Sequence, residues 1–312
     1  MGVLDSKKIA FVFPGQGSQV VGMGRDLVEN YEVAAELFKR ADDALGFGLS
    51  KMCFDGPDDD LKQTLNTQPA LFATSAAAFE VAKAQGIAPA FCAGHSVGEY
   101  AALYAAGAFT FETGLALVRR RAELMQKAAE ANPGAMAAIL GLSPDQVKEV
   151  VAKAADAGIV TAANFNSPIQ TVISGTSAGV AKASEIASGM GAKRVVPLSV
   201  SGGFHSPLMQ SAADELAGIL ERAEIVDPAV PVVANVTAGF ETSAAEVRAN
   251  LAAQITGSVR WVESVSVMLD AGAEVFIELG SGNVLAGLIK RMAPDAGVYS
   301  VGDKASLDWL LV

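Results

Sequence analysis

The sequence of 312 residues contains only two cysteines and two histidines. Cys53 and Cys92 are too few for a disulfide framework, and no grouping of cysteine with histidine has the spacing of a zinc site. We therefore expect no metal centre, and a protein of the reducing cytoplasm.

Long apolar runs are also missing. No stretch approaches ~18 uninterrupted apolar residues, and the run from Ile9 to Phe13 is too short for a signal peptide. Residues 1–6 match the pattern for N-terminal myristoylation, but so short a pattern recurs by chance. We expect no association with a membrane.

Basic residues are outnumbered, with 23 Lys and Arg against 34 Asp and Glu, and the formal net charge is -11. This acidic balance argues against non-specific binding to nucleic acid or to an anionic membrane. An acidic partner would need a local basic patch. With 51% hydrophobic residues the chain can bury a large core, as one large domain or as one domain with an insert.

The segment Gly94-His95-Ser96-Val97-Gly98 connects a short apolar run, 90–93, to a helix-like stretch, 99–106, that stops at Gly107. This context predicts a nucleophile elbow, in which a serine is held in a strained backbone conformation with its hydroxyl at the end of a sheet. Glycines on both sides let the strand and the helix approach closely. The alternative is a tight glycine turn whose serine only caps the following helix.

A first buried strand, 8–13, leads directly into a glycine loop, 14–19. This loop fails the phosphate-binding patterns because Val20 stands in place of the third glycine and no Gly-Lys-Ser/Thr follows. It could instead aim backbone N–H groups at a developing negative charge, as half of an oxyanion hole, or form a plain tight turn. A second glycine loop, 280–283, fails the dinucleotide pattern in the same way.

Residues 111–130 have the periodicity of an amphipathic helix, and Arg121 falls inside the apolar arc. A guanidinium that faces the core is costly without an anion, because it cannot shed its proton. Either a carboxylate of the protein pairs with it, or its fork of donors binds the carboxylate of a substrate. The helical pattern leaves both possibilities open.

Residues 131–198 show a different pattern. Strands are predicted at 135–140, 159–163, 170–174 and 193–200, with a turn at 166–168, a helix after the capping-box residue Ser143 and a helix at 177–187. The order β-α-β-β-α-β is that of a ferredoxin-like unit. We therefore interpret 131–198 as an insert into a parent domain formed by 1–130 and 199–312.

The parent domain alternates strands with helices, which predicts an α/β sheet with the active site at the strand ends. Residues 25–89 are predicted to be largely helical. Further along, 230–234 and 274–279 are predicted strands, and 244–254 is a predicted helix capped by Ser243.

His205 is the best candidate for a general base. The other histidine, His95, adjoins Ser96 within the elbow and cannot easily turn back onto that hydroxyl. His205 lies in a loop ahead of a helix beginning near Pro207, where such a base belongs. Elbow hydrolases normally carry Asp or Glu between the serine and the histidine, but no acidic residue lies near this loop on its N-terminal side until Glu185. Something other than a carboxylate is therefore predicted to orient the imidazole.

Taken together, these residues resemble the malonyl-CoA:acyl carrier protein transacylases, acyltransferases that load malonyl groups in bacterial fatty-acid synthesis. The likeness spans nearly the whole chain and implies an α/β fold, with an α/β-hydrolase-like large domain and an inserted ferredoxin-like small domain. The blocks that carry it are Phe11–Gln19, Gly94–Tyr100, Arg121–Gln126, Asn164–Ser167 with Gln170, Phe204–Ser206, Gln254 with Trp261, and Glu278–Gly280.

The resemblance implies a role for each of five residues. Ser96 is the nucleophile and His205 is its base, with the imidazole oriented by the backbone carbonyl of Gln254. The backbone N–H groups of Gln16 and Val97 form the oxyanion hole.

The resemblance also implies that Arg121 binds the malonyl carboxylate and that His95, Asn164 and Phe204 line the pocket. Phe204 is similar to the residue in the malonyl-selecting form of the family. The implied partners are malonyl-CoA and acyl carrier protein, in a ping-pong exchange without a cofactor, and a cytoplasmic monomer is expected. Candidates for docking the acidic carrier protein are four basic residues, Lys193, Arg194, Lys290 and Arg291.

Three other functions remain open at this point. The same chemistry could serve polyketide synthesis, with a different acyl unit. An esterase or thioesterase would use the same serine and histidine but give the acyl group to water. A non-catalytic binder of carrier proteins is disfavoured because Ser96, His205 and Arg121 are all present.

Overall fold

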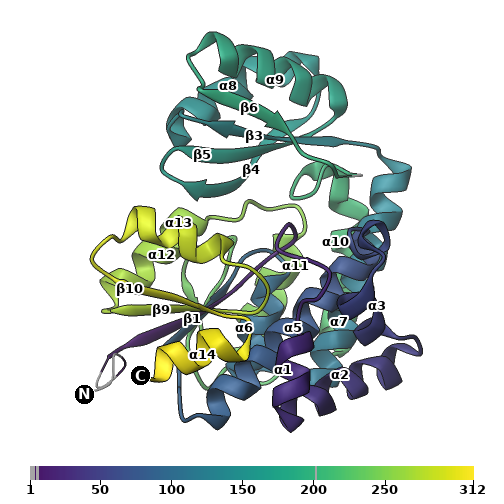
Figure 1. Cartoon of the computed structure of the whole chain (residues 1–312). Helices are drawn as coiled ribbons and strands as arrows, with labels where there is room; N and C mark the ends of the chain where they lie inside the picture. The colour runs from purple at the N-terminus through teal and green to yellow at the C-terminus, as the bar shows by residue number, and fades with distance from the viewer. Residues whose placement is uncertain (1–3, 5–6, 201) are drawn as a thin grey trace.

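The computed structural model describes residue 4, residues 7–200 and residues 202–312. Apart from Leu4, the myristoylation match lies outside the described residues. The chain folds as a mixed α/β protein with two separate sheets (Figure 1). No helix among the described residues is long and apolar enough to cross a membrane.

The larger sheet has six strands. In spatial order they are β10 (Gly297–Val301), β9 (Val275–Leu279), β1 (Ile9–Phe13), β2 (Phe91–Gly94), β7 (Val232–Val233) and β8 (Phe240–Glu241). The first five run parallel, and β8 pairs antiparallel with β7. Because the carboxyl ends of parallel strands share one edge, the loops after β1, β2, β7 and β9 meet there.

Alternation along β1 explains why helices cover both faces of this sheet. Ile9, Phe11 and Phe13 pack on one face, whereas Ala10 and Val12 pack on the other. The first face is covered by α5 (Thr64–Ala84), α6 (Gly98–Ala105) and α7 (Phe111–Ala131), and the second by α12 (Trp261–Asp270) and α13 (Val284–Met292).

The remaining helices of the large unit surround this core. They are α1 (Arg25–Asn30), α2 (Glu32–Leu45), α3 (Leu49–Asp55), α4 (Asp58–Leu61), the 3-10 turn η2 (Pro207–Met209), α10 (Gln210–Arg222), α11 (Ala244–Gln254) and α14 (Lys304–Leu311). The helical prediction for 25–89 is confirmed by α1 to α5, and the Ser243 cap of α11 forms a capping box with Glu246. Sequence analysis did not identify β8, β10, α12 or α14, and the strand predicted at 230–234 is only two residues long.

The smaller sheet and its helices lie between residues 135 and 197. Its elements are β3 (Ala135–Leu140), α8 (Pro144–Ala154), η1 (Ala155–Ala157), β4 (Val160–Ser167), β5 (Gln170–Gly175), α9 (Ser177–Gly189) and β6 (Arg194–Pro197). The strand order is β4-β5-β3-β6, with every neighbouring pair antiparallel. The element order and the Ser143 capping box agree with the prediction.

Two boundaries were predicted wrongly in this unit. Asn166 and Ser167 are strand residues of β4, not a turn, because the ladder with β5 continues through two irregularities to the pair Ser167–Gln170. The last strand ends at Pro197 rather than at residue 200.

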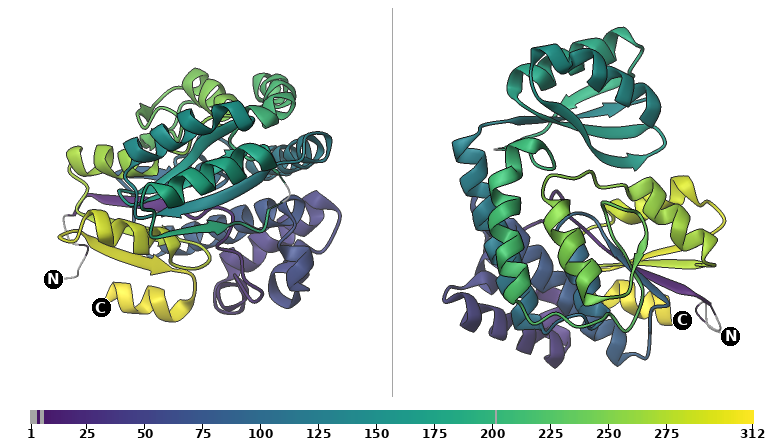
Figure 2. Two further views of the ribbon diagram at one scale, coloured as in Figure 1. Left: turned by 90° about the horizontal axis from the view of Figure 1, so that it is seen from above. Right: turned by 180° about the vertical axis from the view of Figure 1, so that it is seen from behind.

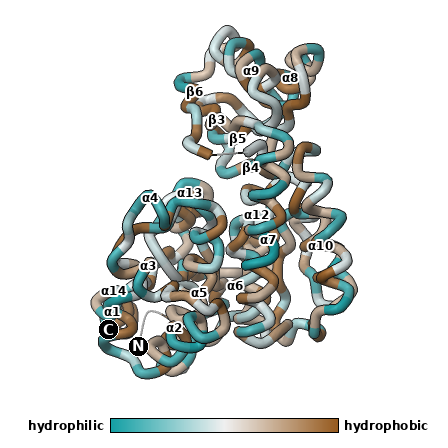
Figure 3. Tube along the Cα trace, turned by 90° about the vertical axis from the view of Figure 1, so that its right-hand side faces the viewer, coloured by the Kyte–Doolittle hydropathy of each residue, from teal (hydrophilic) through white to brown (hydrophobic). Residues whose placement is uncertain are grey.

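The two units face each other across a narrow space. Helices α8 and α9 cover the outer face of the small sheet, while Met136, Ala138 and Val172 belong to the core of the large unit. Figures 2 and 3 show the small unit at one end of the molecule, with α7 leading into it and α10 leading out. The edge strand β4 is also bonded to the large unit, since Val259 N–H donates to Ala163 O at 2.8 Å and Phe165 N–H donates to Val259 O at 2.9 Å.

Candidate active site

The turn after β2 holds Ser96 in the left-handed region, with φ 54°. Such a conformation strains a residue with a side chain, so the surrounding packing must hold it. A Cβ atom on Gly98 would lie 2.2 Å from Phe13 O, and one on Gly94 would lie 2.0 Å from Gly98 O. Only glycine therefore fits where the strand, the turn and α6 meet. The Ser96 hydroxyl does not cap α6, so the geometry is that of an elbow.

Asn235, two residues after the end of β7, holds this turn in place through two hydrogen bonds. Its Oδ1 accepts from Ser96 N–H at 2.7 Å, and its Nδ2 donates to Gly94 O at 2.6 Å. Sequence analysis missed Asn235, because nothing in its local sequence marks a residue that acts on a turn 139 positions away.

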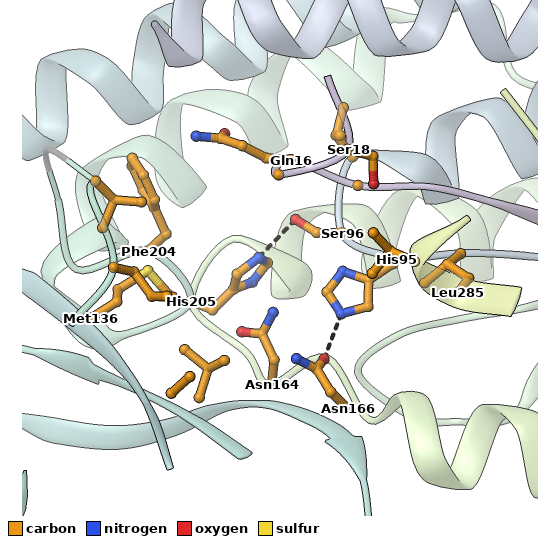
Figure 4. A pocket seen from close by; sticks show the side chains of 18 of the residues that line it. Gln16, Ser18, His95, Ser96, Met136, Asn164, Asn166, Phe204, His205 and Leu285 are labelled. Atoms are coloured by element: carbon orange, nitrogen blue, oxygen red, sulfur yellow. Dashed lines mark hydrogen bonds between the residues drawn. The ribbon is translucent and has the colours of Figure 1, made fainter. Parts of the chain in front are cut away.

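The Ser96 hydroxyl lies 2.8 Å from His205 Nε2 (Figure 4). On the far side of the ring, Nδ1 is 2.9 Å from Gln254 O and 3.1 Å from Gly257 O. Since both of these oxygens can only accept, Nδ1 carries the proton and Nε2 is left free to accept the serine proton.

Burial, and to a smaller extent the positive charge of Arg121, lowers the pKa of His205 to about 3. The imidazole is therefore neutral at physiological pH. Two backbone carbonyls stand where a triad would have a carboxylate, which fits the lack of an acidic residue near His205 in the sequence.

Arg121 projects from α7 into the same site, and it is only 1% exposed. Its Nη1 donates to Gln68 Oε1 at 2.7 Å, while Nη2 donates to Gln254 Oε1 at 2.9 Å and to Ser96 Oγ at 3.1 Å. Its Nε has no partner in the described part of the chain. Burial lowers the pKa of Arg121, but a guanidinium keeps its proton even so.

All three of these partners are neutral oxygen atoms, and within the described residues no carboxylate forms an ion pair with Arg121. The sequence left open whether Arg121 pairs with a carboxylate of the protein or with one of a substrate. The structure contains no such pair within the protein among the described residues. The buried cation faces the serine hydroxyl without a counter-charge, which favours an anionic ligand.

Gln68 is a second residue that sequence analysis missed. The sequence offered one signal for it, a polar residue within a largely apolar helix, since α5 is buried along most of its length. Its amide oxygen helps to aim the guanidinium of Arg121.

The glycine loop after β1 lies against the elbow, because a Cβ on Gly15 would be 2.4 Å from His95 O. The amide N–H groups of Gln16 and Val97 both belong to residues that line the cavity around Ser96. Neither N–H donates a hydrogen bond to another group of the described residues. Two free N–H donors in the wall around a nucleophile suit a developing oxyanion.

The cavity has a volume of about 250 Å³ and lies between the carboxyl edge of the large sheet and the inner face of the small sheet. His95 Nε2 donates to Asn166 Oδ1 at 2.8 Å and so links the elbow to β4 (Figure 4). Asn164 Oδ1 is buried without a partner among the described residues, and Phe204 is buried in the wall. The lining residues are Gly15, Gln16, Gly17, Ser18, Gln68, His95, Ser96, Val97, Arg121, Met125, Met136, Ala138, Asn164, Asn166, Gln170, Val172, Leu198, Val200, Phe204, His205, Val284, Leu285 and Leu288.

The residues to which the sequence analysis gave a role in catalysis or in the acyl pocket therefore all line this cavity except Gln254, which lies behind His205. The four docking candidates do not line it. Across the described ranges, no group of three or more His, Cys, Asp or Glu side chains could hold a metal ion.

Comparison with known proteins gives consistent results. The sequence model of the family described as acyl transferase domain matches residues 10–298. The malonyl CoA-acyl carrier protein transacylase of Bacillus subtilis (strain 168) is 46% identical over 96% of this chain and 95% of its own length. The protein of the same name from Escherichia coli (strain K12) is 43% identical over 96% of this chain and 97% of its own length.

Two solved structures agree closely with this fold. An acyl carrier protein S-malonyltransferase from Vibrio cholerae has a TM-score of 0.94 and 45% identity, covering 97% of this chain and 99% of that chain. A malonyl-transacylase in complex with its type II PKS acyl-carrier protein has a TM-score of 0.95 and 42% identity, with the same coverage.

Proposed function

Because the chain belongs to the acyl transferase domain family, we propose that it moves a malonyl group from malonyl-CoA to the phosphopantetheine thiol of an acyl carrier protein. The names of its relatives support both the acyl group and the acceptor. The observation that carries the proposal is Arg121, a buried cation without a counter-charge that lies 3.1 Å from the Ser96 hydroxyl.

In the first half-reaction, Ser96 Oγ attacks the thioester carbonyl carbon of malonyl-CoA and gives its proton to His205 Nε2. The carbonyl oxygen becomes an oxyanion, which accepts hydrogen bonds from the N–H groups of Gln16 and Val97. Collapse of this intermediate breaks the C–S bond, and the imidazolium returns the proton to the departing CoA sulfur. The products are free CoA and a malonyl ester on Ser96.

In the second half-reaction, His205 Nε2 takes the proton of the phosphopantetheine thiol, and the sulfur attacks the ester carbonyl. The ester bond breaks, and Ser96 Oγ recovers its proton from the imidazolium. Nδ1 stays bonded to its two carbonyl oxygens throughout, so the ring needs no rotation between steps.

A malonyl ester places its free carboxylate one methylene group beyond the ester carbonyl, within reach of a guanidinium that already touches the serine oxygen. Charge-assisted bonds from Arg121 would fix the acyl group and select it over uncharged acyl groups. The cavity wall includes apolar side chains such as Met136, Val172 and Phe204, which would help to exclude water from the acyl group.

The fold supports a finer assignment of the two units. We assign the large unit, 1–130 and 199–312, as an α/β-hydrolase-like domain, in keeping with its parallel sheet and its elbow after β2. We assign 131–198 as a ferredoxin-like insert, in keeping with its element order and its strand order β4-β5-β3-β6. The active site then lies between the two domains, in a cytoplasmic monomer.

The acidic carrier protein would dock near the mouth of the cavity. Lys193 and Arg194 are exposed at the start of β6, and Leu198, which follows that strand, lines the cavity. Lys290 and Arg291 are exposed on α13, the helix whose first turns line the cavity through Val284, Leu285 and Leu288. These four basic residues belong to segments that also contribute to the cavity wall, and their positive charge suits an acidic partner.

The test is the intact mass of the protein after mixing with malonyl-CoA, acetyl-CoA or methylmalonyl-CoA in parallel. We expect one malonyl adduct, its transfer to a carrier protein, and no adduct on Ser96→Ala. A malonyl adduct on Ser96→Ala would refute the nucleophile assignment, and release of malonate to water in the presence of carrier protein would indicate a thioesterase. Because one close structural relative serves a type II PKS carrier, carriers from both pathways belong in the assay.

A further inference from the structure

The side chain of Gln254 lies between Arg121 and the elbow, although orienting His205 requires only the backbone carbonyl of this residue. Its backbone oxygen accepts from His205 Nδ1, whereas its side-chain amide turns toward Arg121 and the elbow. The amide is wholly buried, and each of its two polar atoms has a partner.

The chemistry of these partners fixes the orientation of the amide. A guanidinium can only donate, so the amide Oε1 must face Arg121 Nη2, at 2.9 Å. The Nε2 then donates to Glu99 Oε2 at 2.8 Å and to Ser96 O at 3.0 Å. One amide thus spans the space between a buried cation and a buried carboxyl group.

Glu99 would otherwise be the natural counter-ion of Arg121. Its Oε2 is held by Gln254 Nε2 and by Asn235 N–H, and its Oε1 has no partner in the described residues. Burial, together with the neighbouring Glu241, raises the pKa of Glu99 to about 8, so this carboxyl group is largely neutral at pH 7. Glu99 consequently does little to neutralise the positive charge of the guanidinium.

We propose that the Gln254 side chain is a specificity-positioning residue, which aims Arg121 at Ser96 and keeps Glu99 out of ion-pair contact, so that the guanidinium stays available for a substrate carboxylate. This inference rests on the proposed function. It assigns the side chain a task separate from that of the backbone carbonyl, which any residue at this position retains.

The decisive variant is Gln254→Glu, which keeps the shape of the side chain and the backbone carbonyl but places a carboxylate against Arg121. Protonated Glu99 can donate to that new carboxylate, whereas the bond from Gln254 Nε2 to Ser96 O is lost. The measurement is kcat/KM for acylation by malonyl-CoA and by acetyl-CoA. We expect the malonyl-to-acetyl ratio to fall by about 30-fold or more, because the substrate carboxylate must compete with an internal one.

Two further variants complete the experiment. Gln254→Met removes the amide without adding charge, and it should lower the same ratio through a higher KM for malonyl-CoA. Gln85→Glu is the matched control, since it makes the same change of charge at an exposed residue and should leave the ratio unaltered.

The outcomes separate the possible explanations. Folded Gln254→Glu and Gln254→Met proteins with an unaltered ratio would overturn the inference, as would an equal loss for both acyl groups, which would indicate a merely structural role. If the unaltered protein itself forms no malonyl adduct, it is the proposed function that fails.

Discussion

Replacing Arg121 with methionine tests the charge on which malonyl recognition depends. Methionine fills much of the same volume, and the three hydrogen bonds that are lost all end on neutral oxygens. No buried carboxylate is therefore left unpaired, but the buried oxygens Gln68 Oε1 and Gln254 Oε1 lose a donor. Removing a buried cation and losing these two bonds act in opposite directions, so we expect the protein to remain folded.

The expected size of the functional effect follows from the burial of Arg121, which is 1% exposed. Truncating one partner of a desolvated, charge-assisted pair costs about 2–5 kcal/mol, which corresponds to roughly 30- to 4,000-fold in kcat/KM. This loss should apply to malonyl-CoA and not to acetyl-CoA. Arg121 also donates to Ser96 Oγ, but that contribution is common to both acyl groups and cancels in their ratio.

The assay is single-turnover acylation followed by intact mass, with each acyl-CoA in turn. Arg120→Met is the matched control, because Arg120 lies on the same helix but its side chain is 51% exposed. A malonyl-to-acetyl ratio within about threefold of the unaltered value would refute the reasoning, since the expected effect is tenfold larger or more. Arg121 would then have a structural role only.

Two further predictions concern the base and the elbow. Since the pKa of His205 is lowered from 6.5 to about 3, the acylation rate should stay level between about pH 7.5 and 5.5, and an inflection near 6.5 would contradict this. The unfolded state binds more protons than the folded state between these two pKa values, so the contribution of His205 to stability should decline as the pH falls through that window, as urea unfolding can measure. Gly98→Ala should destabilise the protein by about 2 kcal/mol or more, because its Cβ would lie 2.2 Å from Phe13 O. The control Gly287→Ala has open space in α13 and should raise the melting temperature slightly; equal melting temperatures for the two variants would count against the steric argument.

The elbow, the helix that carries Arg121 and the element order of the small unit were all predictable from sequence. Each depends on residues close together in the chain: glycines flanking Ser96, an apolar arc repeating every few residues, and a capping box at Ser143. Such patterns act through local sterics and local hydrogen bonds, so they can be recognised in the sequence without knowledge of the tertiary structure. The boundaries of β4 and the short strands β7 and β8 were not predictable, because their extent depends on pairing with distant segments.

The amino-acid sequence by itself determined that Ser96 stands on a strained turn and that Arg121 faces the interior. It also left His205, one of only two histidines, as the candidate base. Only the tertiary structure decided what these groups meet. It places against His205 Nδ1 both the carbonyl of Gln254, which the family resemblance implied, and the carbonyl of Gly257, which sequence analysis did not identify. It also leaves Arg121 without a protein carboxylate beside it. The physical reason is that charge and hydrogen-bond partners inside a protein are fixed by packing between distant segments, whose distances no local pattern contains.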